Sequence, residues 1–152
     1  MFEKYSEHAR SVMERAKQEA QKLRHDHIGT EHILLGLIEV DHGIAAEILR
    51  SENIDLPHTK AMVKELMTYE TGPEDGDYES LPRTAHAQTV IDDAVNEARQ
   101  LKHTKIGTEH LLLGLLYENE GTGAKVIQNM GFKLDDIRKD VMNFIENQKV
   151  AS

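Results

Sequence analysis

Two glutamates in identical four-residue runs are the first candidates for binding chemistry. Each follows Gly-Thr and precedes His, which gives Glu31 and Glu109 in two GTEH runs. A carboxylate of this kind can accept two parallel hydrogen bonds from a guanidinium group. Two hydroxyl residues, Ser6 and Thr84, stand at the expected starts of amphipathic helices, where unpaired amides and the helix dipole attract phosphate. These four residues are the candidate ligand-binding set.

Histidines around the first GTEH run raise metal binding as an alternative. Four side chains close in sequence offer nitrogen and oxygen ligands, namely His25, His27, Glu31 and His32. The position of His27 becomes Lys105 in the second run, so the complete set is not repeated, and no HExxH pattern occurs. We therefore expect no metal ligands and no cofactor, and a metal-dependent enzyme is the weakest alternative.

The segment EGTGAKV at 120–126 superficially resembles a phosphate-binding loop. It lacks the GxxxxGK[ST] spacing and no strand is expected before it, so we interpret it as the turn that starts a helix. No Ser/His/Asp or paired-carboxylate pattern stands out from the other acids and histidines. The sequence therefore predicts a binding domain with no catalytic residue, and any ATPase would lie outside these 152 residues.

The two GTEH runs belong to an internal duplication. Residues 6–67 align without gaps with residues 84–145, and 21 of those 62 positions are identical, where chance would give about four. We assign the whole of residues 1–152 to one domain, with repeat one at about 2–67 and repeat two at about 84–148. The acidic segment between them, about 68–83, contains Gly and Pro and is expected to be an exposed linker.

Each copy is expected to form four helices, which predicts an all-α fold of eight helices related by a pseudo-twofold axis. The first helix should run from about Ser6 to Leu23, with its apolar residues on one stripe. The second should begin at Thr30 as its N-cap. A third, short helix should follow Gly43, and a fourth should follow Pro57, placed at the first helical position.

Glycine recurs inside the second helix of each copy, at Gly36 and Gly114. Glycine in a helix interior costs about 1 kcal/mol relative to alanine. A cost that appears twice indicates a close approach between helices at these points.

Charge and composition exclude several classes of partner. The chain carries a net charge of −9, from 18 basic and 27 acidic residues, which opposes binding to nucleic acid or to an anionic membrane. It contains no cysteine, so it has neither disulfides nor thiolate ligands. The N-terminus lacks the apolar segment of a signal peptide, and no apolar run is long enough to span a bilayer. We expect a cytoplasmic protein.

The pattern GTEH-[IL]-LLGL occurs twice, each time after a helix of the form EA-x-x-L-x-H. This arrangement closely resembles the Clp N-terminal domain, the double repeat of ClpC- and ClpA-type AAA+ unfoldases, with the ClpC branch nearest. The resemblance covers about residues 2–146. It implies a domain that docks protein substrates and adaptor proteins and passes them to AAA+ ATPase modules and a ClpP-type protease. A stand-alone double repeat that binds adaptors or regulates the protease is the alternative.

The resemblance also implies a ligand. ClpC-type domains bind arginine-phosphorylated proteins in two equivalent pockets, one per repeat, with the GTEH glutamate on the guanidinium and the phosphate near the start of the first helix. Carried over to this chain, the pockets would pair Ser6 with Glu31 and Thr84 with Glu109. The phosphoarginine candidates that the resemblance implies are thus Ser6, Glu31, Thr84 and Glu109, and the chemistry described above supports the same four residues.

The chain departs from the family pattern at the helix starts. The family commonly has Thr-Pro-Arg or Thr-Glu-Arg there, whereas this chain has His8 and His86 at the basic position, and Glu7 could repel phosphate. Histidine is a weaker phosphate partner than arginine at neutral pH.

The other residues of the motif also have structural interpretations. Glu31 and Glu109 suit the first turn of a helix whatever they bind. We expect His32 and His110 to pack or hydrogen-bond near the turn. His25 and His103 are expected to bond the terminal carbonyls of the preceding helix.

Overall fold

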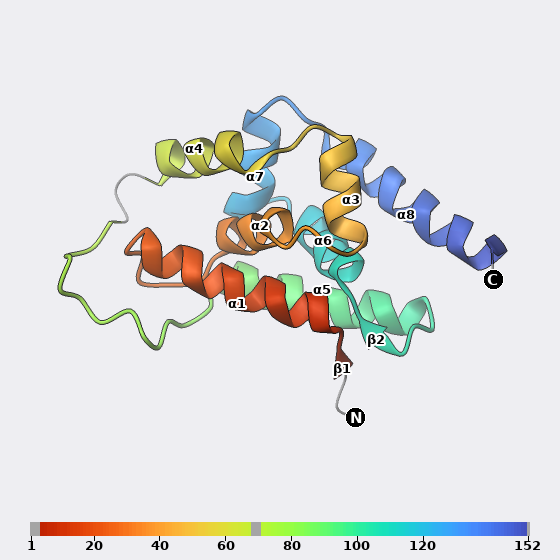
Figure 1. The fold of residues 1–152 in the computed structure, drawn as a ribbon, viewed down its shortest axis with the longest axis horizontal. Coiled ribbons are helices and arrows are strands. Elements are labelled where there is room, and N and C mark those ends of the chain that lie inside the picture. Colours follow the sequence, from red (N-terminus) through yellow and green to blue (C-terminus); the bar gives the residue numbers. More distant parts are fainter. Residues whose placement is uncertain (1–3, 68–70, 152) are drawn as a thin grey trace.

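The computed structural model describes residues 4–67 and 71–151, and in these ranges it is built almost entirely from helices (Figure 1). The first repeat contributes α1 (Glu7–Lys22), α2 (Thr30–Glu39), α3 (Ile44–Ser51) and α4 (Leu56–Leu66). The second contributes α5 (Ala85–Gln100), α6 (Thr108–Tyr117), α7 (Thr122–Asn129) and α8 (Leu134–Ala151). The predicted all-α class with eight helices is confirmed. Two-residue strands, β1 (Lys4–Tyr5) and β2 (Lys105–Ile106), are an addition that the sequence did not predict.

Each repeat opens with a long amphipathic helix capped by a hydroxyl residue, as predicted. The side-chain oxygen of Ser6 accepts a 3.1 Å hydrogen bond from the amide of Ala9, and Thr84 accepts one of 3.1 Å from Ala87. Each bond satisfies one of the amides that a helix start leaves unpaired. The capping hydroxyls therefore define where α1 and α5 begin.

The second helix of each repeat lies at the centre of the core. Every residue of α2 from Thr30 to Leu37 is buried, and all but one of the corresponding residues of α6 are buried too. A Cβ at Gly36 would lie 2.5 Å from the carbonyl oxygen of Val12 on α1, and one at Gly114 would collide with Val90 on α5 in the same way. The expected close approach of helices at both glycines is confirmed.

The two repeats interlock through the segments that precede their helices. Strand β1, before α1, pairs in parallel with β2, before α6, and the reciprocal bridge joins Ile28 to Arg83. The amide of Ser6 donates to the carbonyl oxygen of Ile106 at 2.9 Å, and the amide of Thr84 donates to Ile28 at 3.0 Å. The start of the first helix in each repeat is therefore fastened to the GTEH turn of the other repeat.

The two GTEH threonines add further hydrogen bonds between the repeats, which the sequence did not predict. Thr30 is the first residue of α2 and not its N-cap, which is Gly29. Its hydroxyl oxygen instead accepts a 2.7 Å hydrogen bond from the amide of Gly123 in α7. Thr108 accepts the matching bond from Ala45 in α3 at 3.2 Å. Each threonine thus caps the third helix of the opposite repeat, where no capping side chain is present in the local sequence.

The segment between the repeats folds back on the first repeat. The amide of Gly72 donates to Arg24 at 2.7 Å, and the amide of Ile28 donates to Pro82 at 2.8 Å. The described part of the predicted linker, 71–83, contains no helix, whereas residues 68–70 lie outside the described residues. Within the described ranges, no helix has both the length and the apolar character needed to cross a bilayer.

The fourth helix begins one residue earlier than predicted. Leu56 is its first residue and Pro57 its second, because the carboxylate of Asp55 accepts a 2.9 Å hydrogen bond from the amide of His58 and so caps the helix. Proline is still tolerated at this place, since the amides of the first turn have no partner within the helix.

Candidate functional site

A pocket of about 540 Å³ lies where the start of α1 meets the GTEH turn of the second repeat. We call it the Ser6 pocket. Twelve residues line it: Ser6, His8, Gly43, Ile44, Lys102, His103, Thr104, Lys105, Gly107, Thr108, Glu109 and Gln148. The hydroxyl-capped start of α1 and the carboxylate of Glu109 therefore line one cavity.

A second, smaller pocket of about 340 Å³ occupies the equivalent place in the other half of the duplication. We call it the Thr84 pocket. It is lined by His27, Thr30, Glu31, Met67, Thr84, His86 and Thr122. Each position except Met67 has its repeat counterpart in the Ser6 pocket.

The expected pairing of these residues within one repeat is wrong. Ser6 shares its pocket with Glu109, and Thr84 shares its pocket with Glu31. The physical reason is the exchange of backbone hydrogen bonds between β1 and β2 and between Ile28 and Thr84, which carries each helix start to the opposite GTEH turn. All four candidate residues do line pockets, but each pocket is assembled from both repeats.

Each helix start keeps amides that could meet an anion. At the start of α1, the amide of Ala9 is bonded to the Ser6 side chain and that of Arg10 to the Ser6 carbonyl. The amides of Glu7 and His8 have no acceptor among the residues that the structure describes. Glu7, the side chain expected to repel phosphate, is not among the residues that line the pocket. The Ser6 hydroxyl can also donate its own proton.

The two glutamates lie in different electrostatic surroundings. Burial raises the pKa of Glu109, and its own backbone amide and His103 offset this only in part. Burial also acts on Glu31, but the hydrogen bond from His27 and the neighbouring histidines outweigh it and leave the pKa of Glu31 below its ordinary value. An acid whose charge is destabilised by burial gains from a cationic ligand. The surroundings of Glu109 therefore stabilise its charge less than those of Glu31 do.

Glycine precedes each GTEH threonine because the glutamate side chain folds back over it. A Cβ at Gly29 would collide with the Oε1 atom of Glu31, and a Cβ at Gly107 would collide with that of Glu109. The glycines thus make room for the carboxylates within the turn.

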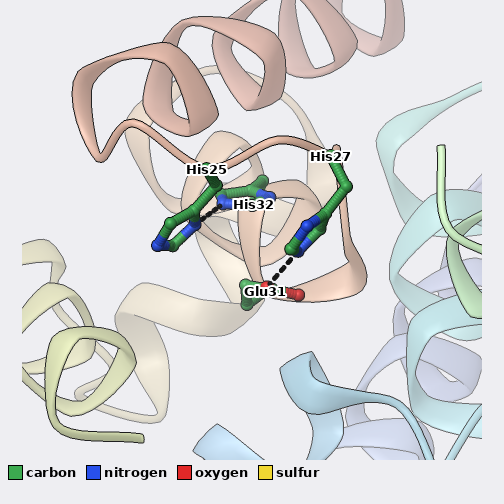
Figure 2. A group of neighbouring side chains, drawn as sticks. All are labelled: His25, His27, Glu31 and His32. Carbon is green, nitrogen blue, oxygen red and sulfur yellow. Dashed lines mark hydrogen bonds and ion pairs between the residues drawn. The ribbon is translucent and has the colours of Figure 1, made fainter. Parts of the chain in front are cut away.

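The histidines of each turn form a short hydrogen-bonded chain. In the first repeat, the amide of Gly29 donates to Nδ1 of His32 at 2.9 Å. Nε2 of His32 lies 2.7 Å from Nδ1 of His25 (Figure 2). In the second repeat, the corresponding distances are 2.8 Å from Gly107 to His110 and 2.8 Å from His110 to His103. The expected structural role of His32 and His110 near the turn is confirmed. The rings of His25 and His103 serve as partners for this chain, while their backbone amides bond the helix-terminal carbonyls.

The position of the proton on the His32 ring makes the histidine cluster a hydrogen-bonded chain and a poor metal site. The ligand atoms of His25, His27, Glu31 and His32 lie within 4.8 Å of one another, and so do those of His103, Glu109 and His110. Because an amide donates to Nδ1 of His32, a neutral ring must carry its proton on Nε2. That proton occupies the lone-pair position that a metal ion would need. The repetition of His25 and His32 as His103 and His110 follows from the same chain.

Several residues that line the pockets were not among the predicted site residues. They are Lys102, Lys105, Gln148 and the two GTEH threonines. The offset of 78 residues pairs Lys102 with Arg24, just as it pairs Lys105 with His27. Nothing in the sequence alone reveals which repeat supplies which half of a pocket.

Comparison with known proteins agrees with the duplication. The Clp repeat (R) N-terminal domain family matches residues 4–82 and again residues 82–152. A probable ATP-dependent Clp protease ATP-binding subunit of Chlamydia pneumoniae is 38% identical over 146 residues, which is 96% of this chain and 17% of that protein. The chloroplastic chaperone protein ClpC1 of Arabidopsis thaliana is 41% identical over 153 residues, covering 100% of this chain and 16% of the relative. The chain therefore spans about a sixth of the length of these relatives.

Solved structures share the fold. The N-terminal domain of ClpD from Arabidopsis thaliana superposes with a TM-score of 0.79 at 21% identity, covering 95% of this chain and 99% of that one. The Hsp104 N-terminal domain from Candida albicans gives a TM-score of 0.77 at 15% identity, over 93% of this chain and 91% of that one. With both repeats matched by the family and with relatives close to 40% identical along the chain, the protein belongs to the Clp repeat N-terminal domain family, as a double Clp repeat homologous to the N-terminal domains of ClpC- and ClpA-type Clp ATPases.

Proposed function

We propose that this chain is the substrate- and adaptor-docking domain of a ClpC-type protein unfoldase and that it recognises arginine-phosphorylated proteins. The remainder of such an unfoldase supplies the ATPase, which acts together with a ClpP-type protease. The observation that carries the proposal is the pairing, in two cavities, of a hydroxyl-capped helix start with a GTEH glutamate. The relatives named as Clp protease ATP-binding subunit and ClpC1 support the wider context.

The two ends of a phosphoarginine side chain match the two halves of each cavity. The phosphate carries close to two negative charges and needs several hydrogen-bond donors. In the Ser6 pocket, the amide of His8 and the Ser6 hydroxyl supply donors beside the positive end of the helix dipole. The guanidinium end needs a carboxylate, and Glu109 provides one within the same cavity.

The position of the pockets suits docking of a flexible segment. Both cavities are open to solvent, and both are formed from short backbone segments that the exchange between repeats holds in place. A ligand side chain can enter without opening the hydrophobic core, which lies beneath, around α2 and α6. Little ordering of the domain is then needed on binding, which favours recognition of many different substrates through one modified side chain.

Calorimetric titration with free phosphoarginine tests the proposal. We expect two binding events per chain, no binding of unmodified arginine at the same concentrations, and loss of binding in the variant Glu31→Ala/Glu109→Ala. The matched control is Glu14→Ala/Glu65→Ala, which removes two exposed carboxylates outside both pockets and should bind as the original does. Binding that survives in the pocket variant would reject the assignment of the site.

A further inference from the structure

We propose that the two pockets are unequal and that the Ser6 pocket is the principal site for a phosphorylated guanidinium ligand, with Lys105 and His27 as the residues that set the difference. The inference rests on the proposed function. It departs from the expectation of two equivalent pockets that the family resemblance implies. Lys105 and His27 occupy equivalent positions in the two repeats, so the two pockets of one chain can be compared directly at this position.

In the Thr84 pocket, the carboxylate is already engaged. Nε2 of His27 lies 3.4 Å from Oε2 of Glu31 (Figure 2). Nδ1 of the same ring lies 2.9 Å from Oδ1 of Asp26. The Glu31 side chain is only 2% exposed. A guanidinium group that reaches Glu31 must therefore displace the His27 ring or share the carboxylate with it.

In the Ser6 pocket, the position that corresponds to His27 places no imidazole against the carboxylate of Glu109. Lys105 replaces the imidazole, and it is exposed at the rim while still lining the cavity. Among the residues that the structure describes, Glu109 has no ion-pair partner, and burial raises its pKa. Glu109 thus gains more from a cationic ligand than Glu31 does, because the protein compensates its charge less than that of Glu31.

The charges that line the two cavities also differ. The Ser6 pocket carries Lys102 and Lys105 against the single acid Glu109, which gives a formal charge of +1 with histidines neutral. The Thr84 pocket carries Glu31 and no lysine or arginine, and its His27 ring already contacts two carboxylates, those of Glu31 and Asp26. A phosphate approaching with nearly two negative charges is therefore attracted more strongly to the first cavity than to the second.

The histidines at the two helix starts, His8 and His86, add to the difference in charge between the pockets. Nδ1 of His86 lies 3.3 Å from Oε2 of Glu118, so a carboxylate stands beside the phosphate end of the Thr84 pocket. The ring of His8 instead packs edge-on against His42, with the ring centres 5.8 Å apart. Hydrogen bonds between charged groups contribute strongly to the free energy of binding. One additional lysine contact to the phosphate therefore corresponds to about a tenfold difference in affinity.

Amide NMR separates the two pockets, because each has its own reporter at the helix start. Phosphoarginine is titrated into the intact chain while the signals of His8 and His86 are followed. We expect the dissociation constant read from His8 to be about tenfold lower than that read from His86. Equal constants, or tighter binding at His86, would overturn the inference while leaving the proposed function in place. Absence of binding at both reporters would reject the proposed function, and this inference with it.

Reciprocal variants test the residues named as the cause. Lys105→His should weaken binding at the His8 reporter, and His27→Lys should strengthen binding at the His86 reporter, each leaving the other pocket unchanged. Lys139→His is the matched control, since it removes an exposed lysine of α8 that lines neither cavity. If both exchanges leave the ratio of the two constants unaltered, the difference does not arise from this position.

Discussion

The backbone amide of Ser6 donates a 2.9 Å hydrogen bond to the carbonyl oxygen of Ile106, which lies in the other repeat. This bond continues the pairing of β1 with β2 and places the N-terminus of α1 beside the second GTEH turn (Figure 1). The reciprocal bond, from Thr84 to Ile28, does the same for α5. Both candidate pockets are consequences of these contacts, so neither repeat could form a pocket by itself.

Exchange of capping groups between repeats should contribute measurably to stability. Thr30→Val keeps the shape of the side chain but leaves the buried amide of Gly123 without its acceptor. The expected loss is about 1–3 kcal/mol in the free energy of unfolding, measured by urea denaturation. Thr89→Val, on the exposed face of α5, is the control and should have a smaller effect. An unchanged urea midpoint for Thr30→Val would show that this contact does not hold the repeats together.

Close packing at the central glycines should make them intolerant of any side chain. In Gly36→Ala, the added methyl group would lie 2.5 Å from the carbonyl oxygen of Val12, so α1 and α2 must move apart. We expect a loss of roughly 1–3 kcal/mol, although alanine is the better helix former. Gly131→Ala meets no atom within 4 Å and serves as a comparison in which only the positive φ of 96° is strained. Thermal unfolding of the two variants measures the difference, and a Gly36→Ala protein as stable as the original would refute the packing argument.

The helices were predictable because their signals are local. The hydroxyl of Ser6 marks a helix start whatever surrounds it, and the apolar spacing that follows requires a buried face. The recurrence of Gly36 as Gly114 likewise pointed to a close contact between neighbouring helices. These features depend on residues within one or two helical turns, so the sequence alone contains them.

The exchange between repeats was not predictable in the same way. Thr30 has the residue type of an N-cap, and only the position of α7 turns its hydroxyl toward Gly123. The pairing of Ser6 with Glu109 depends on a two-residue strand, too short to leave a pattern in the sequence. A duplication specifies that two sites are alike, but it does not specify whether each is built within one copy or between the two.

Acidification should destabilise the fold through its histidine chains. Burial lowers the pKa of His32 and His110 to about 4, from an ordinary value of 6.5. Between these values the unfolded chain binds protons that the folded chain does not, so these groups stabilise the fold above pH 6.5, and that contribution falls as the pH is lowered toward 4. Urea unfolding at a series of pH values should show this slope. It should flatten in His32→Gln/His110→Gln and persist in the control His42→Gln, whose side chain is exposed. A slope identical in all three proteins would contradict the assignment.

An acid at the end of α3 should act in the opposite direction. The Glu52 side chain meets Asp140 of α8, and this contact, with burial, raises the pKa of Glu52 to about 7. Because the folded chain then holds a proton that the unfolded chain releases, the contribution of Glu52 weakens as the pH rises from 4.5 to 7. Glu52→Gln should therefore raise the melting temperature more at pH 8 than at pH 5. Glu47→Gln, an exposed acid on the same helix, is the control. An equal effect of Glu52→Gln at both pH values would exclude this proton-sharing contact.

The assembly of each pocket from opposite repeats is tested most directly by one measurement, a phosphoarginine titration of Glu31→Ala and Glu109→Ala followed by amide NMR at the helix starts. The change in the His8 signal should disappear in Glu109→Ala and persist in Glu31→Ala, and the His86 signal should behave in the reverse manner. Loss of the His8 response in Glu31→Ala, with Glu109→Ala responding as the original does, would contradict the cross-repeat pockets.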